Sequence, residues 1–395
     1  MRRIYLDNAA TTYVLPQVVN VMTQWLDECY GNPSSIYSFS DKSREGIAKS
    51  RQQTANVIGA DSSEIYFTGS GTEADNWALK GLAFTRRNKG NHIITTAIEH
   101  HAILHAAEFL EKNGYDVTFL PVDSMGRVSV LDVKNAITDK TILVSVMFAN
   151  NEIGTLQPIS EIGALCRSRG VIFHTDAVQA VAHVPIDVVK MNIDLLSLSG
   201  HKFHGSKGVG ALYIRNGLKI ENFIHGGGQE RGHRAGTENT AGIVGLGMAA
   251  EIVYAEMPVE HKRISGLRDK LIDGVMRLIP DTKLNGAPGD ERLSNNANFS
   301  FIGIEGETLL LDLDQAGVSA STGSACTSGS LDPSHVLMAI GLSHELAHGS
   351  LRLTLGKQNT EDEIDYVLSV LPQIVARRRE MSPLWDDYVK LWRKE

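Results

Sequence analysis

The feature that most constrains the fold is an alternation of two hydrophobic patterns between Glu64 and Arg215. Short apolar runs rich in β-branched residues alternate there with stretches whose apolar residues recur at helical spacing. The runs predict strands at Glu64–Thr68, His92–Ala97, Val117–Pro121, Ile142–Phe148, Val171–Thr175, Leu195–Ser199 and Gly210–Ile214, and the helical patterns cover Glu73–Phe84, His101–Lys112 and Ser160–Arg169. Such alternation predicts an α/β fold with a mostly parallel sheet covered by helices on both faces.

The chain beyond Arg215 has a different pattern. A glycine-rich basic loop, His225–Thr237, precedes an apolar helix from about Thr240 to Ala255, and Pro258 predicts a break there. We therefore expect a large domain over residues 13–256, and a smaller α+β domain formed by residues 1–12 and 257–395. The smaller domain is expected to contain strands near Ala297–Ile302 and Leu351–Leu355 and helices near Glu305–Leu313, Pro333–Ile340 and Thr360–Arg378.

Charge and cysteine content limit the class of protein. The chain has 38 Lys and Arg against 46 Asp and Glu, so its net charge of −8 argues against nucleic acid as a direct partner. The purest apolar run, Ile142–Ala149, falls far short of the roughly 20 residues that span a bilayer, and Asp7 stands where a signal peptide needs its apolar run. We expect a cytoplasmic protein without a membrane partner. Cys29 and Cys166 are interpreted as packing residues.

Three polar segments follow predicted strands, where open α/β sheets bind their ligands. Ser70-Gly71-Thr72 opens a helix, so its backbone N–H groups can hold a phosphate. Asp176 and Gln179 follow the strand at Val171–Thr175, and Lys202 follows the strand at Leu195–Ser199. Taken singly, each has a simpler interpretation, such as a plain strand-to-helix turn at Gly71 or a helix cap at Asp176.

Together the three segments indicate a cofactor. A lysine in apolar surroundings can form a Schiff base, most commonly with pyridoxal phosphate. That cofactor also needs an anion cradle, a carboxylate for its pyridine nitrogen and a flat group to stack on its ring. Residues 70–76 can supply the first and Asp176 the second, while His100 is a candidate for the third.

A fourth candidate site is the small-residue loop at about 321–333, which contains Cys326. Pro333 is well placed to begin the following helix. A thiol in a polar loop near a helix N-terminus is of the type that becomes a reactive thiolate. The alternative interpretation is an incidental surface cysteine.

These motifs occur in the order found in cysteine desulfurases of the NifS/IscS type, pyridoxal-phosphate enzymes of the class-V aminotransferase family with the aspartate-aminotransferase fold (fold type I). The chain resembles that family from Tyr5-Leu-Asp-Asn-Ala-Ala-Thr-Thr12 to Leu351-Arg352. The motifs between are Gly31-Asn-Pro-Ser-Ser35, Thr68–Asn76, Asn150-Asn-Glu-Ile-Gly154, His201-Lys202, His225-Gly-Gly-Gly228 and Ser324-Ala-Cys-Thr-Ser328. Tyr37 and Ser206 depart from the family pattern, which usually has histidine and proline there.

The resemblance implies a role for each site residue. Lys202 would hold pyridoxal 5′-phosphate as a Schiff base and act as general base and acid, and Cys326 would be the nucleophile that becomes a persulfide. His100 would stack on the ring. The other implied cofactor contacts are Asp176 at the pyridine nitrogen, Gln179 at the phenolic oxygen, Asn151 beside the ring, and Gly71, Thr72, Ser199, His201 and Thr237 at the phosphate. Thr237 would come from the second subunit of a homodimer, and Arg352 with Asn151 would bind the substrate carboxylate.

The implied activity is conversion of L-cysteine to L-alanine, with transfer of sulfane sulfur from Cys326 to an acceptor such as an iron–sulfur cluster scaffold. Selenocysteine lysis and another pyridoxal-phosphate-dependent amino-group transfer are the alternatives that keep the cofactor. A sulfur carrier without catalysis would leave Lys202 and Asp176 without a purpose. A metal enzyme is disfavoured, because His100, His101, His105, His201 and His204 form no known ligand motif.

Overall fold

The computed structural model describes residues 3–322 and 333–392, with side chains up to Lys390. Its main sheet has seven strands in the order β2-β8-β7-β6-β5-β3-β4. Their bounds are β2 Ile65–Thr68, β3 His92–Thr96, β4 Asp116–Leu120, β5 Thr141–Ser145, β6 Ile172–Asp176, β7 Leu195–Ser199 and β8 Gly210–Ile214. Strands β3 to β7 run parallel, and β8 is antiparallel to both β2 and β7. The predicted α/β fold with a mostly parallel sheet is confirmed.

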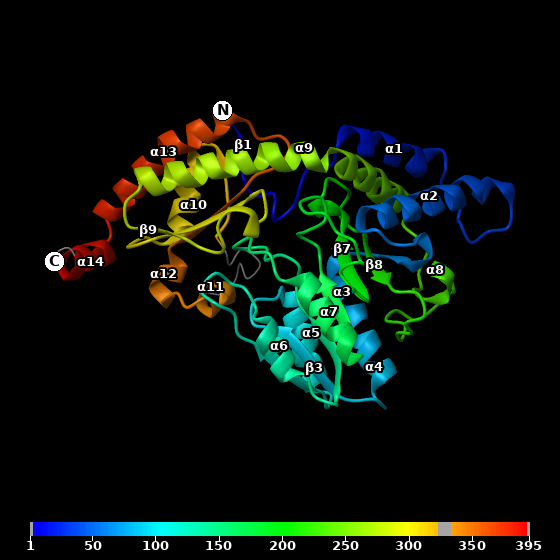
Figure 1. The fold of residues 1–395 in the computed structure, drawn as a ribbon. Helices are drawn as coiled ribbons and strands as arrows, with labels where there is room; N and C mark the ends of the chain where they lie inside the picture. Colours follow the sequence, from blue (N-terminus) through cyan, green and yellow to red (C-terminus); the bar gives the residue numbers. More distant parts are fainter. Residues whose placement is uncertain (1–2, 323–332, 393–395) are drawn as a thin grey trace.

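Helices pack on both faces of this sheet because successive strand residues point to opposite sides (Figure 1). Ile93 and Leu195 face one apolar cluster, which includes side chains of α3 Gly71–Asn76, α4 Leu82–Arg86 and α5 His101–Glu111. Their neighbours Ile94 and Leu196 face the other cluster, with α2 Asp41–Ile58, α6 Val130–Ala136 and α7 Ile159–Arg169. A π-helical turn, Trp77–Gly81, joins α3 to α4, so the helical stretch is continuous from residue 71 to 86.

A second, three-stranded sheet has the order β12-β10-β9 and lies at the other end of the molecule (Figure 1). Its strands are β9 Thr282–Leu284, β10 Asn296–Phe301 and β12 Ser350–Thr354, all antiparallel. A separate apolar cluster joins this sheet to α10 Gly306–Gln315 and α13 Glu361–Glu380. The chain's beginning belongs here too, since β1 Ile4–Tyr5 pairs in parallel with β11 Val318–Ser319. The remaining helices are α1 Pro16–Asp27, α8 Gln229–Gly232, α11 His335–Ala339, α12 His344–His348 and α14 Pro383–Trp392.

One helix links the two parts, and here the sequence-based expectation was wrong. Helix α9 runs unbroken from Thr240 to Leu278 with Pro258 inside it. A proline cannot donate the usual hydrogen bond to the carbonyl of residue i−4, which here is Tyr254. Pro258 and Tyr254 are both exposed, so water can bind the Tyr254 carbonyl instead. Buried residues continue on either side of the proline, with Val253 in the first cluster and Ile264 in the second. The domain division expected near residue 256 stays a prediction.

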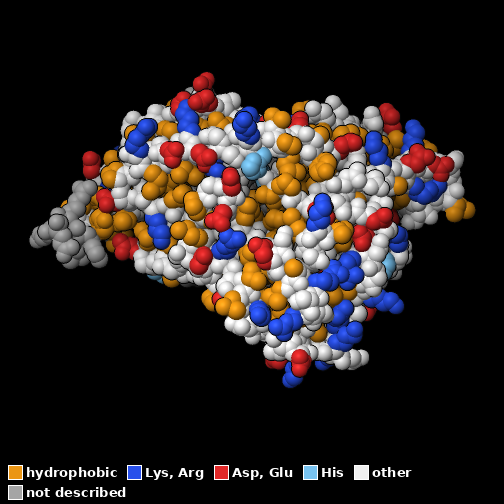
Figure 2. All heavy atoms as spheres, in the orientation of Figure 1, with side chains coloured by type: hydrophobic (Ala, Val, Ile, Leu, Met, Phe, Trp, Pro, Cys, Tyr) orange, Lys and Arg blue, Asp and Glu red, His pale blue; other side chains and the backbone are white. Residues whose placement is uncertain are grey.

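Among the described residues, α9 is the one helix whose length and composition would allow it to cross a bilayer. However, 56% of its apolar window is buried inside the structure, as in the core helix of a globular protein. Figure 2 shows acidic and basic side chains on the surface above this helix. The apolar character of α9 is therefore explained by its packing against both parts of the molecule.

Candidate active site

A cavity of about 990 Å³, its mouth included, opens at the carboxyl ends of β6 and β7. Because these neighbouring strands are parallel, Asp176 at the end of β6 and Ser199 at the end of β7 meet at the same edge. The predicted site residues that line it are Gly71, Thr72, His100, Asn151, Asp176, Gln179, Ser199, His201, Lys202 and Arg352. The structure thus brings together residues that are far apart in sequence.

Lys202 lies in a 3₁₀ turn, Gly200–Lys202, directly after β7. Its Nζ donates hydrogen bonds to the carbonyl oxygens of Ala9 and Ala10, the latter at 2.8 Å. Gln179 Nε2 donates to the same Ala9 oxygen at 3.0 Å. The segment after β1 is therefore part of the cavity wall, which the strand pattern alone did not indicate.

Two buried carboxyl groups lie at the closed end of the cavity. Asp176 accepts a hydrogen bond from the Val178 amide at 2.9 Å, and burial raises its pKa. Asp75 on α3 is 1% exposed, and its Oδ1 accepts no hydrogen bond among the described residues, although His174 Nε2 lies 3.8 Å from it. Burial, followed by the charge of Asp176, raises the pKa of Asp75 well above its usual value. Two neighbouring buried carboxyl groups are stabilised by a cationic or proton-donating group of a ligand bound beside them.

His100 caps the N-terminus of α5, where its Nδ1 accepts a hydrogen bond from the Ala102 amide at 3.1 Å. Burial, with a smaller contribution from the charge of Lys202, lowers the pKa of His100 to about 4. The imidazole is therefore neutral at pH 7. A flat uncharged ring facing the cavity is suited to stacking on an aromatic cofactor.

The N-terminus of the helical stretch that begins at Gly71 forms another part of the cavity wall. The Ser70 hydroxyl caps it by accepting from the Glu73 amide at 3.1 Å, and the Glu73 carboxylate accepts from the Gly69 amide at 2.8 Å. These contacts leave the amides of Gly71 and Thr72 available to an anion. A Cβ atom on Gly71 would lie 2.7 Å from Val178 Cγ2, so glycine is required by packing.

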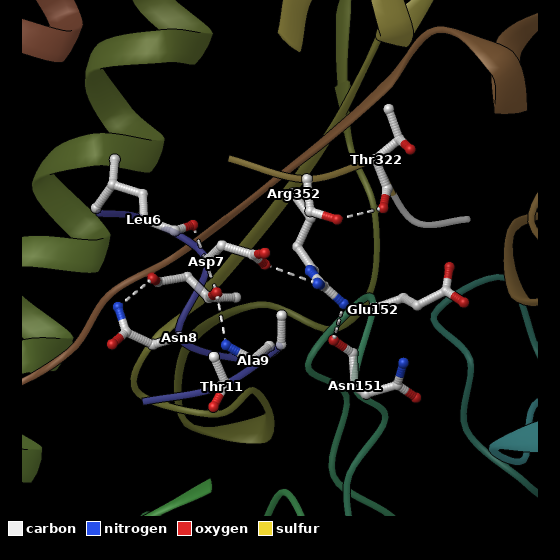
Figure 3. A network of polar contacts seen from close by, with 12 residues as sticks. Leu6, Asp7, Asn8, Ala9, Thr11, Asn151, Glu152, Thr322 and Arg352 are labelled. Carbon is white, nitrogen blue, oxygen red and sulfur yellow. Dashed lines mark hydrogen bonds and ion pairs between the residues drawn. The ribbon is translucent and has the colours of Figure 1, made fainter. Parts of the chain in front are cut away.

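Arg352 on β12 reaches the cavity from the second sheet (Figure 3). One guanidinium nitrogen donates to the carbonyl oxygen of Asn151 at 3.0 Å, and another donates to Asp7 Oδ1 at 2.9 Å. Its Nε is buried and has no hydrogen-bond partner among the described residues. The acidic partner Asp7 had no predicted role, although it lies within the motif Tyr5–Thr12.

These features fit pyridoxal 5′-phosphate. The buried carboxyl pair Asp75 and Asp176 suits a protonated pyridine nitrogen, and the Lys202 amine suits a Schiff base. The helix N-terminus at Gly71 suits the phosphate. Two predicted site residues are not among the residues that line this cavity in the described part of the chain. Thr237 is exposed, and Cys326 lies outside the described residues.

Cys29 and Cys166 are both buried free thiols, as expected for packing residues, and burial raises the pKa of Cys166 to about 12. Within residues 3–322 and 333–392, no group of three His, Cys, Asp or Glu side chains has a geometry that could hold a metal ion.

Comparison with known proteins identifies the family. The model of the class-V aminotransferases matches residues 4–367. The chain belongs to this family. A cysteine desulfurase IscS of Clostridium botulinum is 64% identical over 391 residues, which cover 98% of each protein. A solved NifS-like protein is 40% identical with a TM-score of 0.89, over 95% of this chain and all of that one. A solved structure of SspA in complex with cysteine is 38% identical with a TM-score of 0.79, over 89% of this chain and 98% of that one.

These similarities confirm the predicted family, the fold-type I architecture and the dependence on pyridoxal phosphate. They cover nearly the whole chain, so both sheets belong to the shared fold.

Proposed function

We propose that this class-V family member is a cysteine desulfurase, which converts L-cysteine to L-alanine and transfers the sulfur through Cys326. The observation that carries the proposal is the meeting of Lys202, Asp176 and Arg352 in one cavity. These side chains provide an amine, an acid and a carboxylate-binding group. The identity to proteins named cysteine desulfurase supports the same conclusion.

Cofactor binding uses the closed part of the cavity. Lys202 would hold pyridoxal phosphate through a Schiff base, with Asp176 at its pyridine nitrogen, Gln179 at its phenolic oxygen and His100 against its ring. Asn151 would lie beside the ring. The phosphate ligands would be Gly71, Thr72, Ser199 and His201, joined by Thr237 of the partner subunit. When bound, the cofactor withdraws electrons from the substrate's α-carbon.

Arg352 would bind the α-carboxylate of L-cysteine, because its planar guanidinium fork matches that group. Lys202 Nζ would remove the α-proton and later return a proton to the product. The Cys326 thiolate would attack the substrate sulfur and form the S–S bond of a persulfide. The electron pair of the broken carbon–sulfur bond stays with the carbon skeleton, which takes up a proton and leaves as L-alanine.

Partners follow from this chemistry. A persulfide must give up its terminal sulfur before the next turnover, and the proposed acceptor is a protein such as an iron–sulfur cluster scaffold. The chain would act as a homodimer in the cytoplasm. The exposed position of Thr237 in the glycine-rich loop is compatible with a contact across the dimer.

The test is production of L-alanine and sulfide from L-cysteine in the presence of a reductant, with visible spectra recorded alongside. Wild type should be active, and both Lys202→Ala and Cys326→Ala should lose activity. The Schiff-base absorption should be lost only in Lys202→Ala, because Cys326 has no part in holding the cofactor. Full turnover by Cys326→Ala would overturn the persulfide mechanism, and a yellow wild-type protein that forms no alanine would overturn the substrate assignment.

A further inference from the structure

The residue after Asn151 is a buried acid with no part in the proposed chemistry. Glu152 is only 5% exposed. Its turn is rigidly held, because Asn150 Oδ1 accepts from the amides of Glu152 and Ile153 at 2.9 and 3.0 Å. The Glu152 carbonyl oxygen accepts from Asn296 and Asn298 on β10. Burying an acid is unfavourable unless its surroundings compensate for it, so its neighbours are informative.

One compensating neighbour is Arg352. Asn298 on β10 is directly opposite Arg352 on β12, so the Glu152 turn and the arginine lie against the same pair of strands. Figure 3 shows Asp7 and Glu152 on opposite sides of the Arg352 guanidinium. Asp7 forms the direct ion pair at 2.9 Å. Glu152 acts through space, since the charge of Arg352 lowers the pKa of Glu152.

The second neighbour is Ser334 at the start of α11. Its hydroxyl donates to Glu152 Oε2 at 2.5 Å and accepts from the Leu337 amide at 3.2 Å. The next residue, His335, contacts the carbonyl oxygen of Glu99 at 2.9 Å, immediately before His100. Glu152 therefore joins α11 to the turn that carries Asn151.

We propose that Glu152 is a positioning residue for the substrate carboxylate, and that it controls how much of the positive charge of Arg352 is available to the substrate. The proposal rests on the role of Arg352 given under the proposed function. Ionised Glu152 and a bound carboxylate repel one another across the same guanidinium. When Glu152 is neutral, the positive charge of Arg352 is fully available to the substrate carboxylate, and Glu152 can still accept the hydrogen bond from Ser334.

The protonation of Glu152 falls in the range where this effect is measurable. Burial raises its pKa to about 7, against the lowering effects of the Ser334 hydrogen bond and the Arg352 charge. The other charged or titratable groups around the turn are Asp7 beside Arg352, Arg292, which donates to the Ile153 carbonyl, and His335 and Glu99 on the α11 side. By linkage, a carboxylate that binds more weakly to the ionised form raises the pKa of Glu152 in turn. Substrate affinity should therefore fall as pH rises through about 7.

The experiment measures L-cysteine binding to cofactor-loaded protein in a Cys326→Ala background, which blocks sulfur transfer. The visible absorption of the cofactor reports the Kd between pH 5.5 and 8.5. Adding Glu152→Gln should leave the Kd unchanged at pH 5.5 and lower it about five- to tenfold at pH 8.5, since a shift of about one pKa unit corresponds to a tenfold change. Glutamine keeps the shape and an acceptor for Ser334, so the comparison isolates the charge.

Two further variants separate charge from structure. Ser334→Ala removes a hydrogen bond that lowers the pKa of Glu152, so the fall in affinity should move to higher pH. Glu64→Gln alters a buried acid of a different part of the molecule, where it accepts from the amides of Asp61 and Asn216, and should keep the parent profile. Parallel profiles for the parent and Glu152→Gln, or no shift in Ser334→Ala, would overturn the proposal. If Arg352→Ala kept the parent affinity, the carboxylate site itself would be wrong, which is a distinguishable failure.

Discussion

The two ends of the cavity are built in different ways. The cofactor end takes Asp176, Ser199 and Lys202 from the ends of adjacent strands in one sheet. The carboxylate end joins Asp7, Asn151 and Arg352, and the ion pair between Asp7 and Arg352 links residues 345 positions apart. The edge of one sheet therefore positions the cofactor groups. Substrate binding depends instead on contacts between Arg352 on the second sheet and the segments that carry Asp7 and Asn151. Changes at the first end should affect the cofactor and kcat, and changes at the second should affect KM.

The largest effect is expected from Asp176→Ala at the cofactor end. Loss of the carboxylate removes the group that would stabilise a protonated pyridine nitrogen, so kcat should fall by about 10²–10³-fold, as when a preorganised electrostatic group is lost elsewhere. Steady-state rates of alanine formation measure this. Unchanged kcat with a raised KM for L-cysteine would contradict the division between the two ends.

The next effect is expected from Arg352→Lys at the carboxylate end. Lysine keeps the charge but loses the two-pronged hydrogen bonding to a carboxylate, so KM for L-cysteine should rise about tenfold or more. The visible spectrum without substrate should be that of wild type. A loss of cofactor absorption would show that Arg352 also supports the cofactor end.

A steric change at the phosphate cradle should have an intermediate effect. In Gly71→Ala the new methyl group would lie 2.7 Å from Val178 Cγ2, and relieving that overlap should cost about 1–3 kcal/mol. Most of this cost should appear as weaker binding of pyridoxal phosphate, measured by titrating the cofactor-free protein. Equal affinity together with a lower melting temperature would place the strain in the fold instead.

The smallest effect is expected from Asp7→Asn. The amide oxygen can still accept from Arg352, but the competing negative charge is gone, so KM for L-cysteine should fall about threefold, in the range of a partly exposed ion pair. Initial rates at pH 8 measure it. A rise in KM would mean that Asp7 orients Arg352 more than it competes with the substrate.

The same division explains what the sequence could predict. Strands β7 and β8 have the predicted bounds, and Lys202 and Asp176 were found because polar residues after apolar strands mark a sheet edge. Asp7 and Glu152 had no signal of their own, since their importance comes from contacts with residues distant in sequence. Arg352 was assigned by family resemblance rather than by any local pattern.

The continuity of α9 was missed for a related reason. Pro258 is a strong local signal for a helix break, and burial of Val253 and Ile264 in separate clusters outweighs it. Local sequence does not reveal that the solvent-facing position of the proline makes the lost hydrogen bond tolerable.

The most direct test of the account is a single turnover of wild-type enzyme with L-cysteine in the absence of reductant. We predict one L-alanine and one sulfane sulfur per active subunit, with the added sulfur on the peptide that contains Cys326 by mass spectrometry. Alanine formed without protein-bound sulfur, or sulfur bound to another residue, would contradict the account.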